Sequence, residues 1–194
     1  MLTKVQSINL DLTSGWLENV RHCPSPNYDQ RPEQVDIDVL VIHSISLPPC
    51  EFGGGYIDDL FMNRLNPEAH PYFAGIADLR VSAHALIRRT GEVVQYVSFH
   101  DRAWHAGKSC FQGREVCNDF AIGIELEGCD DKAYTDEQYI VLTHITQLLQ
   151  HAYPKITQSH IVGHCHIAPE RKTDPGKWFE WQRFFKTLYH VDKL

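Results

Sequence analysis

The spacing of apolar residues predicts several short buried strands. DVLVIHS is an apolar, β-branched run and predicts a strand that ends at His43. FAIGIELEG predicts a second buried strand, with Glu125 and Glu127 near its end. SAHALIRRTGEVVQYVSF predicts a hairpin, because two apolar runs flank Thr90-Gly91 and glycine adopts a positive φ easily.

Helical spacing occurs in three other segments. YIDDLFMNRL predicts a short helix with four apolar residues on one face, namely Ile57, Leu60, Phe61 and Leu65. In TDEQYIVLTHITQLLQHAY, Thr135 and Gln138 form a capping box, and Pro154 ends the helix. A last helix is expected to begin at Pro175, with Trp178 and Trp181 in the core rather than at a sugar platform.

Segments rich in glycine, proline or polar residues predict loops. They are SLPPCEFGGG, HDRAWHAGKSCFQGREVCND and IVGHCHIAPERKTDPG. No repeat and no long linker divides the sequence, so residues 1–194 are expected to form one domain. The mixture of elements predicts an α/β (α+β) fold, in which helices flank a central mixed sheet.

Composition limits the possible partners and the compartment. A hydrophobic content of 43% supplies a core, and a net charge of −7 argues against binding nucleic acid or an anionic membrane through overall charge. No apolar run approaches the roughly 20 residues that span a bilayer, and the N-terminal segment lacks the features of a secretory signal. We therefore expect a cytoplasmic protein with reduced cysteines, which are Cys23, Cys50, Cys110, Cys117, Cys129 and Cys165.

Twelve histidines point towards a metal or acid–base site. His43 ends a predicted strand, where its side chain can face a cleft; a hydrogen-bonded structural role is the alternative. GHCHIAPERKTDPG brings together His164, His166, Lys172 and Asp174, and a solvated polar loop is the alternative there.

Glu125 lies in an apolar strand, where a carboxylate must be paired or used in chemistry. These residue types suit a catalytic zinc site, in which two histidines and one carboxylate leave a position for water and lower its pKa towards ~7. Glu125 has the chemistry to accept the water proton, and Lys172 to stabilise an oxyanion. The residue pattern leaves open which histidines bind the metal; the candidates are His43, His84, His105, His164 and His166.

Six motifs in the sequence resemble the zinc N-acetylmuramoyl-L-alanine amidase family. This family shares its fold with peptidoglycan recognition proteins and amidase-type phage lysozymes. The resemblance extends from about Gly15 to Phe184. The motifs, in chain order, are VIHSISLPPCEFGG, RVSAHALIRRTGEVVQYV, RAWHAG, CNDFAIGIELEG, YTDEQY and GHCHIAPERKTDPG.

The resemblance implies a site that holds one Zn²⁺ ion. By position in the motifs, its ligands are His43, His164 and Asp174, its catalytic glutamate is Glu125, and its catalytic lysine is Lys172.

The resemblance also implies substrate contacts. It places Trp104 in a sugar pocket and Arg80 at the peptide carboxylate, which an arginine fork can bind in a bidentate manner. Ser44 and His84 are also expected to contact the substrate. The alternative for His84 is a structural role, either behind the zinc ligands or hydrogen-bonded under the sheet.

Three positions depart from the family pattern. Ser44 stands where close relatives carry asparagine, which removes one expected sugar contact. Val116 replaces a basic residue, which is expected to reshape peptide binding. His166 stands where aspartate is usual, and we expect it to structure its loop rather than to bind a second metal ion.

The implied reaction is hydrolysis of the amide bond between the lactyl group of 1,6-anhydro-N-acetylmuramic acid and L-alanine. The expected setting is cytoplasmic peptidoglycan recycling in a Gram-negative bacterium, by a monomer whose partner is the anhydromuropeptide substrate. Lower activity is then expected to let muropeptides that induce β-lactamase accumulate. The alternatives are an amidase that acts on intact cell wall and a non-catalytic peptidoglycan-binding module.

Overall fold

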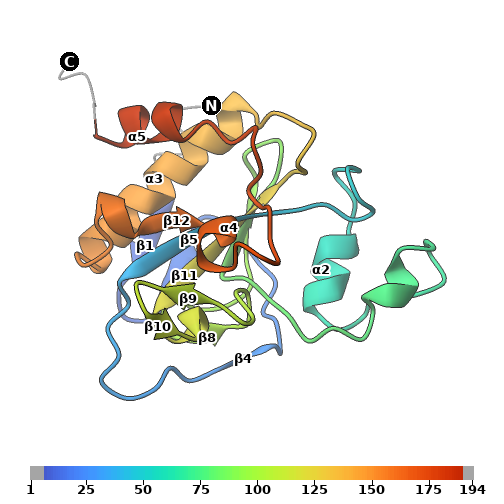
Figure 1. The fold of residues 1–194 in the computed structure, drawn as a ribbon, viewed down its shortest axis with the longest axis horizontal. Helices are drawn as coiled ribbons and strands as arrows, with labels where there is room; N and C mark the ends of the chain where they lie inside the picture. The colour runs from blue at the N-terminus through green and yellow to red at the C-terminus, as the bar shows by residue number, and fades with distance from the viewer. Residues whose placement is uncertain (1–6, 190–194) are drawn as a thin grey trace.

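A six-stranded mixed sheet forms the centre of the computed structural model, which describes residues 7–189 (Figure 1). Its strand order is β12-β5-β11-β6-β7-β3. Neighbouring strands are parallel except β6 and β7, which form the predicted hairpin. The strands are β3 (Arg21–His22), β5 (Val39–Ile45), β6 (Ala85–Ile87), β7 (Val93–Gln95), β11 (Ala121–Glu127) and β12 (Ile161–Gly163). The predicted mixed sheet is therefore confirmed.

Smaller elements surround this sheet. Three two-stranded pairs combine β1 (Asn9–Asp11) with β2 (Trp16–Glu18), β4 (Tyr28–Asp29) with β8 (Arg102–Ala103), and β9 (Cys110–Phe111) with β10 (Arg114–Glu115). The α-helices are α2 (Tyr56–Phe61), α3 (Asp136–Ala152), α4 (His164–Ile167) and α5 (Trp181–Tyr189). Short 3₁₀ turns are η1 (Phe73–Gly75), η2 (Cys117–Asp119) and η3 (Gln158–His160). Within residues 7–189, no helix combines the length and apolar character that crossing a bilayer requires.

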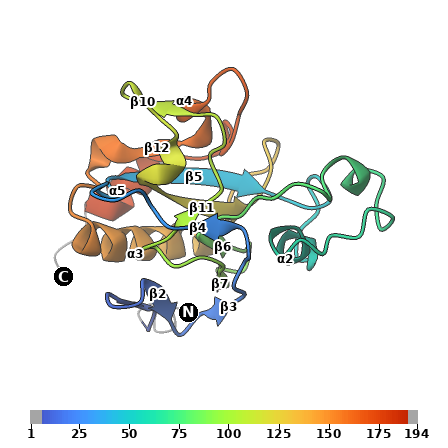
Figure 2. The ribbon, with the colours of Figure 1, turned by 90° about the horizontal axis from the view of Figure 1, so that it is seen from below.

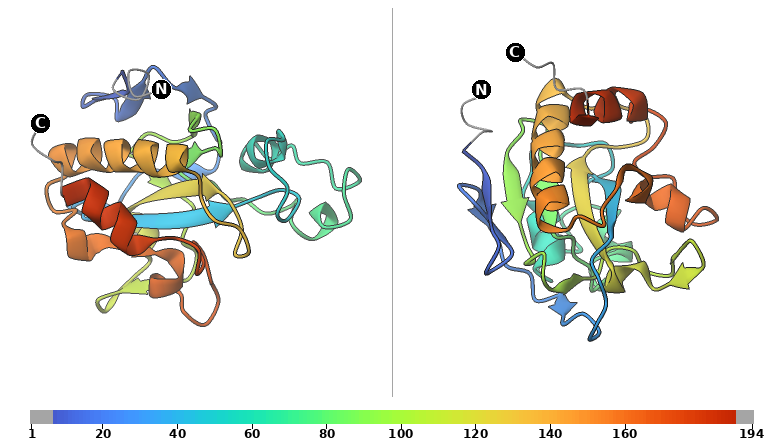
Figure 3. Two further views of the ribbon diagram at one scale, coloured as in Figure 1. Left: turned by 90° about the horizontal axis from the view of Figure 1, so that it is seen from above. Right: turned by 90° about the vertical axis from the view of Figure 1, so that its left-hand side faces the viewer.

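Helix α3 covers one face of the sheet. Alternation along β5 and β11 turns Leu40, Ile42, Ile122 and Ile124 towards this face, where they pack with apolar residues of α3. The predicted capping box of Thr135 and Gln138 is present at the start of α3. Helix α5 packs beside α3 on the same side (Figure 3).

The opposite face of the sheet is covered by α4 and the β9–β10 pair (Figure 3). Val39 and Val41 of β5 pack here against Ala106 and Ile167. His43 and Glu125 continue the same alternation at the ends of their strands. Both side chains are therefore on the face that carries α4.

A third cluster lies around α2, which stands to one side of the sheet (Figure 2). Ile57, Leu60 and Phe61 of this helix are buried together with Leu86 and Tyr96. The helix ends at Phe61, earlier than the predicted range 56–65, and Leu65 is buried beyond its end.

Three predictions about chain segments are wrong in part. The predicted loop 161–176 begins with strand β12 and helix α4, because residues 161–163 pair with β5. The last helix begins at Trp181 rather than Pro175, and Trp178 is 47% exposed instead of lying in the core. The segment 100–119 is not simply irregular surface, because it contains β8, β9 and β10 and buries Ala106.

The prediction that all cysteines are reduced is also wrong. Cys50 and Cys129 form a disulfide, with their Cα atoms 5.4 Å apart. The physical reason is the parallel register of β5 and β11, in which Ile45 lies opposite Glu127. Because both strands end at the same edge, the loops that follow them bring two cysteines 79 residues apart into contact.

Candidate active site

Parallel strand register brings two histidines together. Strand β12 runs beside β5 with Gly163 opposite Ile42, so His164 follows level with His43. The two Nδ1 atoms are 3.0 Å apart, and both side chains are buried. The spacing of 121 residues in the sequence gives no hint of this contact.

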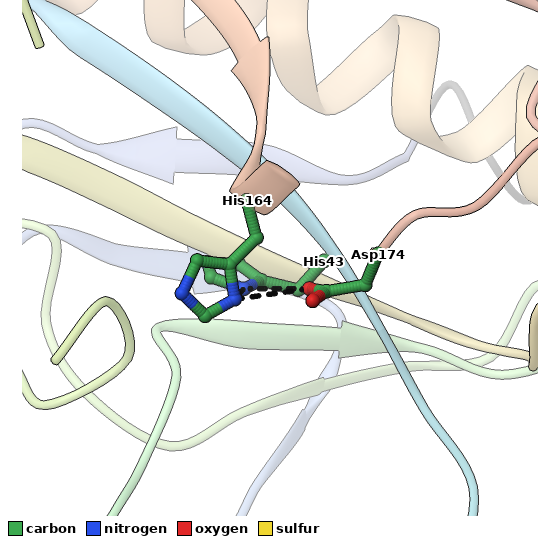
Figure 4. Close-up of side chains that lie close together, drawn as sticks. All are labelled: His43, His164 and Asp174. Carbon is green, nitrogen blue, oxygen red and sulfur yellow. Dashed lines mark hydrogen bonds and ion pairs between the residues drawn. The ribbon is translucent and has the colours of Figure 1, made fainter. Parts of the chain in front are cut away.

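Asp174 completes the group from the loop that follows α4. The backbone N–H of Cys165 donates to the Asp174 carbonyl oxygen at 2.9 Å, which closes the loop and returns Asp174 to the start of α4. Its Oδ2 atom lies 3.1 Å from Nδ1 of His164 and 3.2 Å from Nδ1 of His43. Figure 4 shows the two rings and the carboxylate converging on one point.

The charge state of this group suits a metal ligand set. Burial lowers the pKa of His43 to about 4, so its ring is neutral near pH 7. Burial by itself would raise the pKa of Asp174, but its contacts with His164 and His43 outweigh this and hold the pKa well below the usual range. A neutral His43 ring therefore faces an ionised carboxylate, which is the charge state that a metal ion requires of these two ligands.

These three residues form a group able to hold a metal ion. Adjacent ligands of a tetrahedral zinc ion lie about 3.3 Å apart when the bonds are about 2.0 Å long. The observed separations of 3.0, 3.1 and 3.2 Å fit that spacing. Nitrogen and carboxylate oxygen are also donors that zinc accepts. The residues present therefore fit the expected ion.

Glu125 lies one strand away from the group, opposite His43 in the β5–β11 register. Its side chain is buried, and its Oε2 atom has no hydrogen-bond partner within residues 7–189. Burial, together with the charge of Asp174, raises the pKa of Glu125 well above its ordinary value, while Lys172 acts in the opposite direction. A buried, unpaired carboxylate with a raised pKa is suited to exchanging a proton near neutral pH.

Three residues that are predicted to contact the substrate differ in how exposed their side chains are. Trp104 is half-buried next to His105, and its backbone is fixed by reciprocal hydrogen bonds with Ser82. Arg80 is exposed and has no ion-pair partner in the described part of the chain, so its guanidinium is free. Ser44 is half-buried and lies one position along β5 from His43.

Both ring nitrogens of His84 have hydrogen-bond partners inside the protein. Its side chain is fully buried, its Nδ1 atom accepts from the Gly123 N–H at 3.0 Å, and its Nε2 atom lies 3.1 Å from the Asp101 carbonyl oxygen. Burial and the nearby Arg31 lower its pKa to about 3. These bonds and this burial favour the structural alternative for His84, and its predicted substrate contact stays a prediction.

The other two departures from the family pattern have clear positions. His166 Nδ1 accepts from the Gly163 N–H at 3.0 Å, and its ring lies beside Trp181, so this residue structures its loop. Val116 is exposed and lines a cavity of about 550 Å³ together with Arg171 and Ile167.

His105, one of the five candidate ligand histidines of the residue pattern, lies beside the ligand group rather than within it. Its Nδ1 atom lies 2.9 Å from Nε2 of His43, and burial lowers its pKa well below the ordinary value. A signal for it exists in the sequence, because Gly123 in the middle of a strand indicates the close approach of another group.

The fold and the site together define a hydrolase of mixed α/β architecture, with a ligand set suited to one metal ion and a buried carboxylate beside it. Residues 33–177 match the family model described as N-acetylmuramoyl-L-alanine amidase. The chain belongs to this family and is therefore an amide hydrolase.

Three comparisons agree with this assignment. The chain is 56% identical over 178 residues to the 1,6-anhydro-N-acetylmuramyl-L-alanine amidase AmpD of Haemophilus influenzae, covering 92% of this chain and 97% of that protein. It is similar to the crystal structure of a selenomethionine AmpD derivative, with a TM-score of 0.87, 61% identity and coverage of 91% and 97%. It is also similar to AmiD of E. coli in complex with the substrate anhydro-N-acetylmuramic acid-L-Ala-D-gamma-Glu-L-Lys, with a TM-score of 0.59, 26% identity and coverage of 93% and 65%.

Proposed function

We propose that this chain is a zinc-dependent amidase that cleaves the bond between the lactyl group of 1,6-anhydro-N-acetylmuramic acid and L-alanine. The observation that carries the proposal is the convergence of His43, His164 and Asp174 beside the unpaired carboxylate of Glu125. The substrate class follows from the names of the similar proteins, which act on or bind anhydromuramyl peptides.

Zinc held by His43, His164 and Asp174 would activate water near neutral pH and polarise the amide carbonyl. Glu125 takes up the proton that the attacking water loses, because its raised pKa favours the protonated form. It then returns this proton to the L-alanine nitrogen as the C–N bond breaks. Lys172 offsets the negative charge that develops on the carbonyl oxygen.

Substrate binding involves residues outside the ligand group. Trp104 offers an aromatic face to the sugar, next to His105. Arg80 binds a carboxylate of the stem peptide through its free guanidinium. Ser44 contributes a hydroxyl near the sugar. All the proposed catalytic groups come from one chain, so the proposed reaction needs no second subunit, and a monomer is the form that we propose.

The proposed setting is peptidoglycan recycling in the cytoplasm, where loss of activity would let muropeptides that induce β-lactamase accumulate. One observation favours the alternative, an amidase that acts on intact wall outside the cytoplasm. This observation is the disulfide between Cys50 and Cys129, because disulfides persist in oxidising compartments. Alkylation of free thiols in intact cells before lysis, followed by mass spectrometry of the two cysteines, separates the two settings.

The direct test uses purified protein with anhydro-N-acetylmuramyl-tripeptide and, in parallel, intact cell wall. We expect mass spectrometry to show release of free tripeptide from the soluble substrate, loss of this activity on chelation, and its return with zinc. Faster release of peptide from intact wall would favour the alternative. Cleavage that continues unchanged in the chelated protein would refute the role of zinc.

A further inference from the structure

We propose that His105 is a positioning residue that orients the ligand histidine His43, and that Gly123 and Asn118 are the residues that allow it to do so. This inference rests on the proposed zinc site, and it concerns the groups behind the ligands rather than the ligands themselves. It follows from the hydrogen bonds at the far side of each histidine ring.

A histidine can bind zinc only through a nitrogen that carries no proton, so its proton is on the other nitrogen. In both His43 and His164, the nitrogen that faces the ligand group is Nδ1. The proton of each ring is therefore on Nε2. A partner that accepts this proton fixes both the tautomer and the orientation of the ring.

Two consecutive residues provide these acceptors. Nε2 of His43 lies 2.9 Å from Nδ1 of His105, and Nε2 of His164 lies 3.1 Å from the carbonyl oxygen of Ala106. These two consecutive residues thus orient both ligand rings, although one ligand lies in β5 and the other begins α4.

Asn118 holds this segment in place. Its Oδ1 atom accepts from the backbone N–H of His105 at 3.1 Å and from that of Ala106 at 2.8 Å. Both acceptors for the ligand rings are therefore fixed by a single side chain. The asparagine lies in η2, directly before strand β11.

The unpaired nitrogen of His105 supports a positioning role. Since Nδ1 of His105 accepts from His43, its proton is on Nε2, and this buried atom has no partner within residues 7–189. Leaving a buried N–H unpaired costs about 1–3 kcal/mol. A histidine that served only to fill space would have no reason to leave its Nε2–H unpaired. The contact of its Nδ1 atom with His43 explains why a histidine stands at this position.

Gly123 provides the space for this ring. A Cβ atom at Gly123 would lie 2.4 Å from Cγ and 2.5 Å from Nδ1 of His105. Both distances are too short for any side chain without displacement of the imidazole. The glycine in the middle of β11 therefore permits the hydrogen bond between His105 and His43.

The experiment measures the zinc affinity of each protein by competition with a chromophoric chelator, and the thermal stability of each metal-free protein. His105→Ala should weaken zinc binding by about 10–100-fold. His105→Asn should recover most of the affinity, because an amide oxygen can take the place of Nδ1. His144→Ala is the control, since it removes a hydrogen-bonded histidine far from the ligand group, whose Nε2 atom lies 2.8 Å from the Ile8 carbonyl oxygen.

The role of Gly123 is tested by a double-mutant cycle. Gly123→Ala should weaken zinc binding in the wild-type background but not further in the His105→Ala background, where the ring is gone. An equal loss of zinc affinity in both backgrounds would show that Gly123 is needed for the strand itself. It would refute the proposal that Gly123 makes room for the His105 ring. Asn118→Ala should weaken binding, and Asn118→Asp should restore it through the retained oxygen.

The outcomes separate this inference from the proposed function. If the wild-type protein binds no zinc, the proposed function itself fails. If the wild type binds zinc and His105→Ala binds it equally tightly, only the positioning role is wrong. If His105→Ala fails to fold, two other variants still test the positioning role. His105→Asn keeps an acceptor for His43 and should bind zinc, whereas Gly123→Ala displaces the acceptor and should bind it more weakly.

Discussion

Replacing Glu125 with glutamine tests both the proposed chemistry and the energetic consequence of burying this carboxylate. The change keeps the shape of the side chain but removes its ability to accept a proton. A general base contributes about 10²–10⁴-fold to rate, and each factor of ten corresponds to about 1.4 kcal/mol. We therefore expect kcat to fall by about 10²–10⁴-fold, or about 3–5 kcal/mol, with zinc affinity retained.

The same substitution should stabilise the metal-free protein near pH 7. Burial raises the pKa of Glu125, so the folded chain holds its proton more tightly than the unfolded chain does. The stability from this proton is present below the unfolded pKa and is lost as pH rises through the folded pKa. Glutamine does not ionise, so the variant keeps this stability at neutral pH, and the difference should shrink as pH falls towards 4.

Glu127→Gln is the matched control for Glu125→Gln. Glu127 lies two residues further along β11 and is also buried, but its carboxylate is paired with Arg88 at 3.2 Å and accepts the Gly53 N–H at 2.7 Å. Its substitution should destabilise the protein by about 3–5 kcal/mol and leave the chemical step largely intact. Steady-state kinetics and thermal unfolding distinguish the two. A Glu125→Gln protein with wild-type kcat would refute the assigned role.

Three further predictions concern other parts of the molecule. Lys172→Ala should lower kcat by about 10²–10³-fold with little change in KM, and unchanged kcat in single-turnover experiments would exclude a role in stabilising the oxyanion. Arg80→Ala should raise KM by about 10–100-fold for substrates with a free peptide carboxylate, and should have no such effect when that carboxylate is amidated. Cys50→Ser removes a cross-link that closes 79 residues, so the free energy of unfolding should fall by at most about 4–5 kcal/mol, and thiol titration should show one additional free thiol from Cys129.

The sequence predicts the elements whose stability is local. The helix over Asp136–Ala152 combines a capping box with apolar residues at helical spacing, and the hairpin of β6 and β7 has glycine at its turn. The strands containing His43 and Glu125 are continuous apolar runs, as buried parallel strands usually are. In these segments the pattern of a few neighbouring residues determines the structure.

The parts that the sequence did not predict depend on distant contacts. Residues 161–163 form a strand because they pair with the edge of β5. The sequence alone shows only the glycine and polar residues around them, and these residues are typical of a loop. The pairing of Cys50 with Cys129 depends on where two parallel strands end. The residue pattern nominated His43, His164 and Asp174 as ligand types, whereas their assignment as a set required the family resemblance. Their separations of 3.0–3.2 Å follow from register, which no local pattern contains.

Two strand glycines explain how the site can form at all. Glycine within a strand is less favourable than alanine by about 0.5–1 kcal/mol, so its presence in two buried strands needs a reason. A Cβ atom at Gly123 would collide with His105, and one at Gly163 would lie 2.7 Å from Cδ of Pro175. The first glycine admits the ring that contacts His43, and the second admits the residue that follows Asp174. The lost strand stability is therefore compensated at the site, where both segments must approach the sheet closely for the ligands to meet.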